Sequence, residues 1–258
     1  MIFIYSFLIF FLGVCLGSFA NVCIYRLPKN KQIVSGRSFC PKCKKKINWY
    51  DNLPLISFII LNSKCRNCKR IISSRYFIVE LITGISFLLI YSNFENLNTI
   101  IFLSILSLIL IIIFFIDLEN FIIPDSLNFT IMGLALLKNF LPNFNTSLIH
   151  EINQSIIGGM VGYSSIWLII FLYKTFKKID GMGLGDAKLM AGIGLLFGWQ
   201  SIPFVLFVSA ILGLIFVLPS LLNKQKNMRS EIPFGPFIIV ACLIYFAQGD
   251  LLYSLLLV

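Results

Sequence analysis

The sequence is poor in the residues that most hydrolases use. Its 258 residues include one histidine, His150, and eleven acidic residues, and only 12% of the chain is charged. One histidine makes a Ser-His-Asp hydrolase hard to assemble, and the H-E-x-x-H signature of zinc proteases is absent. The segment "GMGLGD" at 181–186 lacks the G-K-[ST] ending of a phosphate-binding loop. Carboxyl groups therefore remain as the only plausible hydrolytic machinery.

Apolar residues, in contrast, dominate the chain. They make up 58% of it, and the mean hydropathy is +0.92, which is far outside the range of soluble domains. About 20 apolar residues cross the hydrocarbon layer, and the backbone must satisfy its own hydrogen bonds there, which favours helices. We therefore expect an all-α polytopic membrane protein with about eight transmembrane helices. The expected spans are 2–25, 76–92, 97–116, 126–141, 154–173, 186–199, 202–222 and 234–257.

The basic residues predict how these spans are oriented. Thirteen of the 21 lysines and arginines lie between Arg26 and Arg75, and two smaller groups lie at 174–178 and 224–229. Cytoplasmic loops carry an excess of such residues, and eight spans with both ends outside place all three groups in the cytoplasm. His150 then falls in an outer loop. The net charge of +10 thus indicates topology and contact with anionic membrane lipid, rather than binding of nucleic acid.

Between the first two spans lies an insert with four cysteines in two C-x2-C motifs, Cys40, Cys43, Cys65 and Cys68. Four thiolates at this spacing can bind zinc tetrahedrally and leave no position for a catalytic water, so the zinc would be structural. The alternative is a set of surface thiols or a redox pair. We divide the chain into a transmembrane anchor helix at 1–25, a zinc-binding cytoplasmic insert at 26–75, and a transmembrane domain at 76–258.

Acidic residues gather where two expected spans meet the cytoplasm. Asp117 ends the third span after 21 uncharged residues, and Asp186 begins the sixth behind Gly181, Gly183 and Gly185. Two facing carboxyls can share a proton and hold a water between them. Helix dipoles predict that Asp117 is the protonated partner and Asp186 the ionised base, since they lie at opposite helix ends.

A third acid, Asp125, precedes the fourth expected span. It has a structural reading, because Asp125 or Ser126 can be the N-cap of that helix. It also has a functional reading, as a secondary acid in the same site.

Several segments in this order resemble the prepilin peptidases, the type IV leader peptidases of pilus and type II secretion systems. They are "GSFANVCIYRLP", "CPKC", "CRNC", "NLPLISF", "ISSRYFIVELITG", "IDLENFIIPD", "GMGLGDAKLMAGIGLLFGW" and "IPFGPFI". A G-x-G-D with a following lysine and an upstream D-x6-P-D is specific in combination.

The resemblance implies an aspartic endopeptidase in the bacterial cytoplasmic (inner) membrane that cleaves the basic leader of prepilins or pseudopilins on the cytoplasmic side. It implies that Asp117 and Asp186 are catalytic and that the four cysteines bind zinc. Many members also methylate the new N-terminus with S-adenosylmethionine, an activity associated with the insert, which is complete here. The alternatives are a peptidase without methyltransferase activity, or a non-enzymatic zinc-stapled membrane scaffold or transporter.

Overall fold

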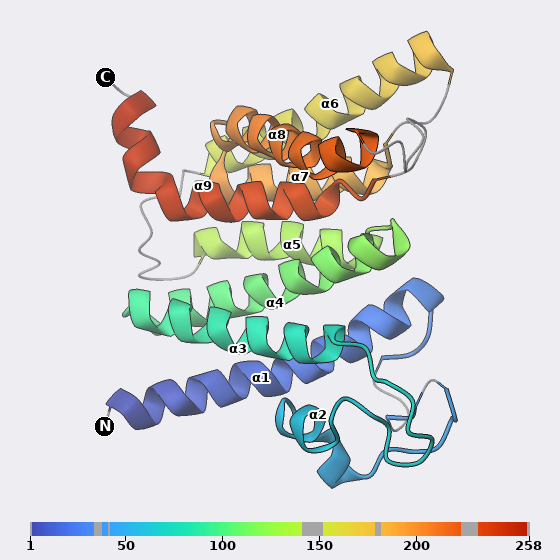
Figure 1. Ribbon diagram of the computed structural model, residues 1–258. Helices are drawn as coiled ribbons and strands as arrows, with labels where there is room; N and C mark the ends of the chain where they lie inside the picture. Colours follow the sequence, from blue (N-terminus) through green and yellow to red (C-terminus); the bar gives the residue numbers. More distant parts are fainter. Residues whose placement is uncertain are drawn as a thin grey trace. The chain divides into compact units, whose positions relative to one another are not determined.

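The regular structure of the chain is helical. The computed structural model describes residues 2–33, 38–40, 42–140, 152–178, 182–222 and 232–256, and in these ranges it contains helices and no strand (Figure 1). The β-pairing within them is limited to two isolated antiparallel bridges, Phe39 with Lys46 and Lys64 with Ile71. The predicted all-α class is confirmed. His150 and the basic group at 224–229 lie outside the described residues.

Five described helices are long and apolar enough to cross a membrane. They are α1 (Ile2–Arg26), α3 (Arg75–Asn93), α4 (Leu97–Asn120), α6 (Ile152–Lys177) and α8 (Ser201–Leu222). Each coincides with an expected span to within a few residues at either end.

The other three expected spans are not confirmed as full crossings. Helices α5 (Asp125–Leu137) and α7 (Leu184–Phe197) have 13 and 14 residues, and α9 (Gly235–Leu256) is apolar over Gly235–Gln248. At 1.5 Å per residue, 14 residues extend about 21 Å, whereas the hydrocarbon core is about 30 Å thick. The count of eight spans therefore remains a hypothesis.

By packing, the chain forms two compact units, Met1–Ile112 and Ile113–Val258. In the first, α1 packs against α3, and the Asn21 side chain donates a hydrogen bond of 3.1 Å to the Tyr76 carbonyl oxygen. The insert between these helices holds two 3-10 helices, η1 (Leu27–Lys29) and η2 (Trp49–Asn52), and the short helix α2 (Ile56–Ile60).

The second unit is built around α7. This helix packs against α5 and α6, and Leu189, Met190 and Ile193 on it are fully buried. A Cβ at Gly158 of α6 would collide with the Gly194 carbonyl oxygen, so only glycine allows the two backbones to approach this closely. Because protein rather than lipid surrounds α7, the ends of this 14-residue helix are shielded from lipid by neighbouring helices.

The far end of α7 is capped by a buried lysine. Lys138, in the 3-10 helix η3 (Lys138–Phe140), is 2% exposed, and its ammonium donates a hydrogen bond to the Leu196 carbonyl oxygen. A cation at a helix C-terminus satisfies a free carbonyl and interacts favourably with the helix dipole. This lysine, isolated from the basic groups in the sequence, thus has a structural role.

Candidate active site

Asp117 lies in the last turn of α4, in the second unit. Its side chain is only 4% exposed. Its Oδ2 accepts a hydrogen bond of 2.9 Å from the backbone N–H of Gly235, the first residue of α9. A carboxyl that sequence places at the end of an apolar helix is therefore held by the beginning of a distant one.

Asp186 lies in the first turn of α7 and is 8% exposed. Its backbone N–H donates to the Gly183 carbonyl oxygen at 3.2 Å, and its carboxyl interacts electrostatically with that of Asp117. The structure thus brings together the two acids that the sequence analysis selected. Two interacting carboxyls in a buried site cannot both be ionised at low cost, which favours a single proton shared between them.

Two glycines, Gly235 and Gly185, pack closely at the site. A Cβ at Gly235 would lie 2.7 Å from Asp117 Oδ2 and 3.0 Å from Ile123 Cδ1, and a Cβ at Gly185 would lie 3.1 Å from Ile123 Cβ. Ile123 therefore packs against both the loop that carries Asp186 and the helix start that holds Asp117. Neither Gly235 nor Ile123 was recognised from sequence, although both lie in segments that carry the family resemblance.

The described glycines before Asp186, Gly183 and Gly185, do not adopt the positive φ angles that favour glycine. Gly183 has φ −83°, and among the described glycines only Gly198 has a positive φ. A Cβ at Gly185 would be in tight contact with Ile123, whereas a Cβ at Gly183 would meet only ordinary contacts at 3.8 Å and beyond. Gly181 lies outside the described residues.

A buried amide supports this loop from α5. Asn128 is fully buried, and its Nδ2 donates a hydrogen bond of 3.3 Å to the Gly185 carbonyl oxygen. Its Oδ1 has no hydrogen-bond partner among the described residues. The sequence signal for Asn128 is an amide side chain within a largely apolar helical segment.

Asp125 does not have the capping role that the sequence suggested. The N-cap of α5 is Pro124, so neither Asp125 nor Ser126 caps the helix, and that prediction was wrong. Asp125 instead forms an ion pair of 2.6 Å with Lys188 of α7, and its side chain is 57% exposed. The pair ties the start of α5 to the helix that carries Asp186.

In the first unit, the four cysteines of the insert form a cluster. The Sγ atoms of Cys40, Cys43, Cys65 and Cys68 all lie within 4.8 Å of one another, and those of Cys40 and Cys68 are 4.0 Å apart. Zinc–sulfur bonds of 2.3 Å in a tetrahedron require sulfur atoms about 3.8 Å apart. The cluster therefore fits a zinc ion.

The two C-x2-C motifs fold in the same way. The N–H of Lys44 donates to the Cys40 carbonyl at 2.8 Å, and the N–H of Lys69 donates to that of Cys65 at 2.9 Å. Both lysines adopt a left-handed conformation, with φ 59° and 57°. The N–H of Cys68 lowers the pKa of the Cys65 thiol to about 7, whereas the pKa of the neighbouring Cys68 thiol is raised. Cys65 is thus the thiol of the pair that ionises first, and a metal requires thiolates.

Together, the fold and the sites define a helical multi-pass membrane protein with a buried pair of carboxyl groups and a four-cysteine insert. Residues 11–94 match the model of the bacterial peptidase A24 N-terminal domain, and residues 104–218 match that of the type IV leader peptidase family. The chain belongs to this family and is a peptidase, as the resemblance implied.

Relatives match over nearly their whole length. A prepilin leader peptidase/N-methyltransferase of Vibrio cholerae serotype O1 is 36% identical over 95% of this chain and 98% of its own. Proteins of the same description from Aeromonas salmonicida and Pseudomonas aeruginosa are each 30% identical, over 96% and 93% of this chain and 92% and 89% of theirs. No solved structure matches the chain.

Proposed function

We propose that the protein is a membrane aspartic endopeptidase that removes the basic leader of type IV prepilins or pseudopilins on the cytoplasmic side of the bacterial inner membrane. The observation that carries this proposal is the buried, interacting pair of Asp117 and Asp186 at the ends of two apolar helices. A substrate with a basic leader and an apolar helical stem has its scissile bond at the membrane surface. Carboxyl groups at helix ends are suited to meet that bond.

In this mechanism the two acids divide the proton transfers. The ionised carboxyl takes a proton from a water that attacks the scissile carbonyl carbon, and the protonated carboxyl donates its proton to the carbonyl oxygen. Collapse of the tetrahedral intermediate breaks the C–N bond. The amine leaves with the proton held by the first carboxyl, and the second carboxyl takes back a proton from an intermediate hydroxyl as the new carbonyl forms. The Gly235 N–H fixes the Asp117 carboxyl throughout this sequence.

We further propose that the enzyme methylates the new N-terminal amine. The name of the relatives supports this, as does the complete insert with its four clustered cysteines. These residues would hold a structural zinc, which closes an insert too small for a hydrophobic core of its own. S-adenosylmethionine would supply the methyl group.

The proposed topology has eight crossings with both ends outside. The concentration of basic residues between Arg26 and Arg75 supports a cytoplasmic insert. Asp117 and Asp186 would then lie at cytoplasmic helix ends, on the side of the basic leader.

Substitution of each acid tests the peptidase mechanism. Asp117→Asn and Asp186→Asn should each abolish leader removal from a coexpressed prepilin, while the protein stays in the membrane at normal amounts. Glu119→Gln is the matched control, because Glu119 is exposed two residues from Asp117 on the same helix. Processing of prepilin by Asp117→Asn at a near-normal rate would overturn the pair and direct attention to Asp125.

Methylation is tested separately. Mass analysis of the mature pilin N-terminus should show one added methyl group. Its absence from a fully cleaved product would support the alternative, a peptidase without methyltransferase activity. Family membership argues against the second alternative, a non-enzymatic scaffold or transporter.

A further inference from the structure

The short helix α2 of the insert has its apolar side on the outside. Ile56, Ile59 and Ile60 are 47%, 64% and 69% exposed. Their i, i+3, i+4 spacing places them on one face of the helix. The polar Ser57 faces inward instead, where it is 9% exposed and its hydroxyl donates a hydrogen bond of 3.0 Å to the Tyr50 carbonyl oxygen. This polarity is the reverse of that expected for a helix in water.

Two contacts hold α2 beside the first turns of α3. The N–H of Leu55, just before α2, donates a hydrogen bond of 2.7 Å to Oε2 of Glu80, and the rings of Phe58 and Phe77 lie 5.3 Å apart. Glu80 is five residues into α3, a helix suited to cross the membrane, and therefore about 7.5 Å from its beginning. In Figure 1, α2 is drawn alongside α1 and level with the first turns of α3, apart from the loops that carry the cysteines.

A strained turn holds this position. Leu55 has φ 60° and ψ −50°, and the Ile56 N–H bonds to the Pro54 carbonyl oxygen at 2.6 Å, which is the rare, strained form of γ-turn. Such a conformation persists only where its surroundings enforce it, and the buried Glu80 carboxyl does so here. The placement of α2 at the depth of α3 is therefore built into the insert.

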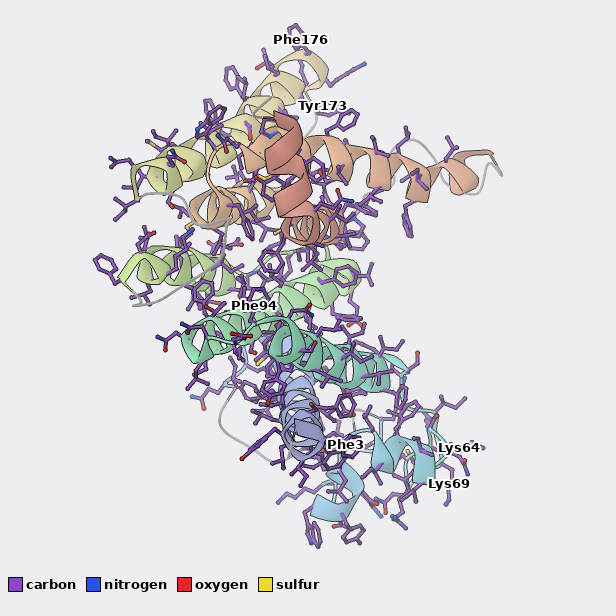
Figure 2. The ribbon with its side chains drawn as sticks, turned by 90° about the vertical axis from the view of Figure 1, so that its left-hand side faces the viewer. Phe3, Lys64, Lys69, Phe94, Tyr173 and Phe176 are labelled. Atoms are coloured by element: carbon purple, nitrogen blue, oxygen red, sulfur yellow. The ribbon has the colours of Figure 1, made fainter. Side chains whose placement is uncertain are left out.

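Residues typical of a membrane–water boundary surround α2. Trp49 and Tyr50, just before it, are 75% and 45% exposed, and both types concentrate at the headgroup level of bilayers. Figure 2 shows Lys64 and Lys69, which follow α2, extending outward from the insert. They belong to the cysteine-bearing part of the insert rather than to α2.

We propose that α2 is a membrane anchor of the insert, with the face of Ile56, Ile59 and Ile60 embedded among the lipid chains of one leaflet. Lipid is the favoured partner of this face, because α2 lies beside the first turns of α3, which is long and apolar enough to cross the membrane. The apolar faces of that helix at Ile78 and Ile82 are likewise exposed, at 40% and 43%. Assignment to the cytoplasmic leaflet rests on the proposed function and its topology, whereas the anchor itself does not.

Tryptophan fluorescence in the full-length protein tests the anchor without reference to activity. The three native tryptophans, Trp49, Trp167 and Trp199, are replaced by phenylalanine, and Ile60→Trp is introduced as the sole probe. Lys64→Trp in the same background is the matched control, because Lys64 is exposed on the cysteine-bearing part of the insert. Both variants are reconstituted without prepilin in vesicles of phosphatidylethanolamine and phosphatidylglycerol, and zinc content verifies that the insert is folded.

We expect Ile60→Trp to emit at shorter wavelength than Lys64→Trp, to be quenched by nitroxide-labelled lipid, and to be several-fold less sensitive to aqueous iodide. Equal iodide sensitivity of the two probes, with no quenching by labelled lipid, would overturn the proposal. Shielding of Ile60→Trp that develops only on addition of prepilin would also overturn it, in favour of a substrate-binding face. Shielding that disappears when vesicles contain one protein molecule each would assign the face to a second copy and reject the lipid anchor.

Discussion

The backbone N–H of Gly235 donates a hydrogen bond of 2.9 Å to Oδ2 of Asp117 across 118 residues of sequence. Gly235 is the first residue of α9, and the free N–H groups at a helix beginning stabilise a carboxylate. Asp117 thus ends its own helix but faces the beginning of another. The helix-end argument that made Asp117 the protonated acid therefore no longer separates the two acids, because Asp117, at the C-terminal end of α4, also faces the N-terminus of α9.

The closeness of Gly235 to Asp117 predicts the effect of one added methyl group. In Gly235→Ala the new Cβ would lie 2.7 Å from Asp117 Oδ2 and 3.0 Å from Ile123 Cδ1, so the carboxyl or α9 must move. A displacement near 1 Å at a catalytic group costs about a hundredfold in rate. We expect prepilin cleavage to fall by about that factor, measured as initial rate with purified protein.

Gly133→Ala provides the matched control. A Cβ at Gly133 of α5 would meet no atom within 4 Å, so the same substitution should leave cleavage unchanged. A Gly235→Ala enzyme as active as Gly133→Ala would mean that Asp117 does not need its position to be held by α9.

Asn128 gives a second prediction, about the loop before Asp186. Asn128→Ala removes the hydrogen bond from Nδ2 to the Gly185 carbonyl oxygen. A neutral hydrogen bond contributes about 0.5–1.5 kcal/mol, equivalent to a roughly two- to twelvefold change in a rate constant. We expect kcat for cleavage to fall within this range while KM changes little, because the bond positions a catalytic group and not the substrate.

Asn139→Ala is the control for Asn128. Asn139, in η3 just beyond the opposite end of α5, donates a hydrogen bond of 3.4 Å to the Leu136 carbonyl oxygen. Its replacement should leave kcat unchanged. Equal losses of kcat in the two variants would indicate a general weakening of α5 rather than a role for Asn128 at the site.

The sequence predicted the parts of this site that depend on local pattern. Asp117 was found because it ends a run of 21 uncharged residues, and the C-x2-C spacing predicted the cysteine cluster. The sequence alone could not show that Ile123 packs between Gly185 and Gly235, because these three residues belong to segments far apart in the chain. Hydropathy also read α7 as a full span, although its apolar residues face neighbouring helices and its length is 14 residues.

The ion pair between Asp125 and Lys188 yields a third prediction, which decides the role of Asp125. The pair is largely exposed, and exposed pairs contribute only about 0–1 kcal/mol. If its role is to tie α5 to α7, Asp125→Asn and Lys188→Met should each reduce cleavage by the same small factor, at most about fivefold. Initial rates of prepilin processing by the two variants measure this.

Unequal losses would contradict the structural role. Complete loss of cleavage in Asp125→Asn, with Lys188→Met nearly active, would make Asp125 a catalytic acid. The double variant adds a check, because two partners of one interaction should together cost no more than either substitution alone.

The cysteine cluster gives the last prediction, which separates the two proposed activities. Cys40→Ser or Cys65→Ser removes one of four thiolates and should abolish stoichiometric zinc, measured by metal analysis of the purified protein. Zinc binding supplies about 10–16 kcal/mol to comparable small folds, so its loss should unfold the insert. Because Asp117 and Asp186 belong to the other compact unit, we expect methylation of the pilin N-terminus to be lost and cleavage to decrease much less.

Cys15→Ser is the control, since Cys15 lies in α1 outside the cluster and should retain zinc and both activities. Full zinc content in Cys40→Ser would contradict the metal site itself. Equal loss of cleavage and methylation would show instead that the insert also holds the prepilin for cleavage. The metal group consists of the four cysteines alone, so loss of zinc would not remove a ligand of the carboxyl pair.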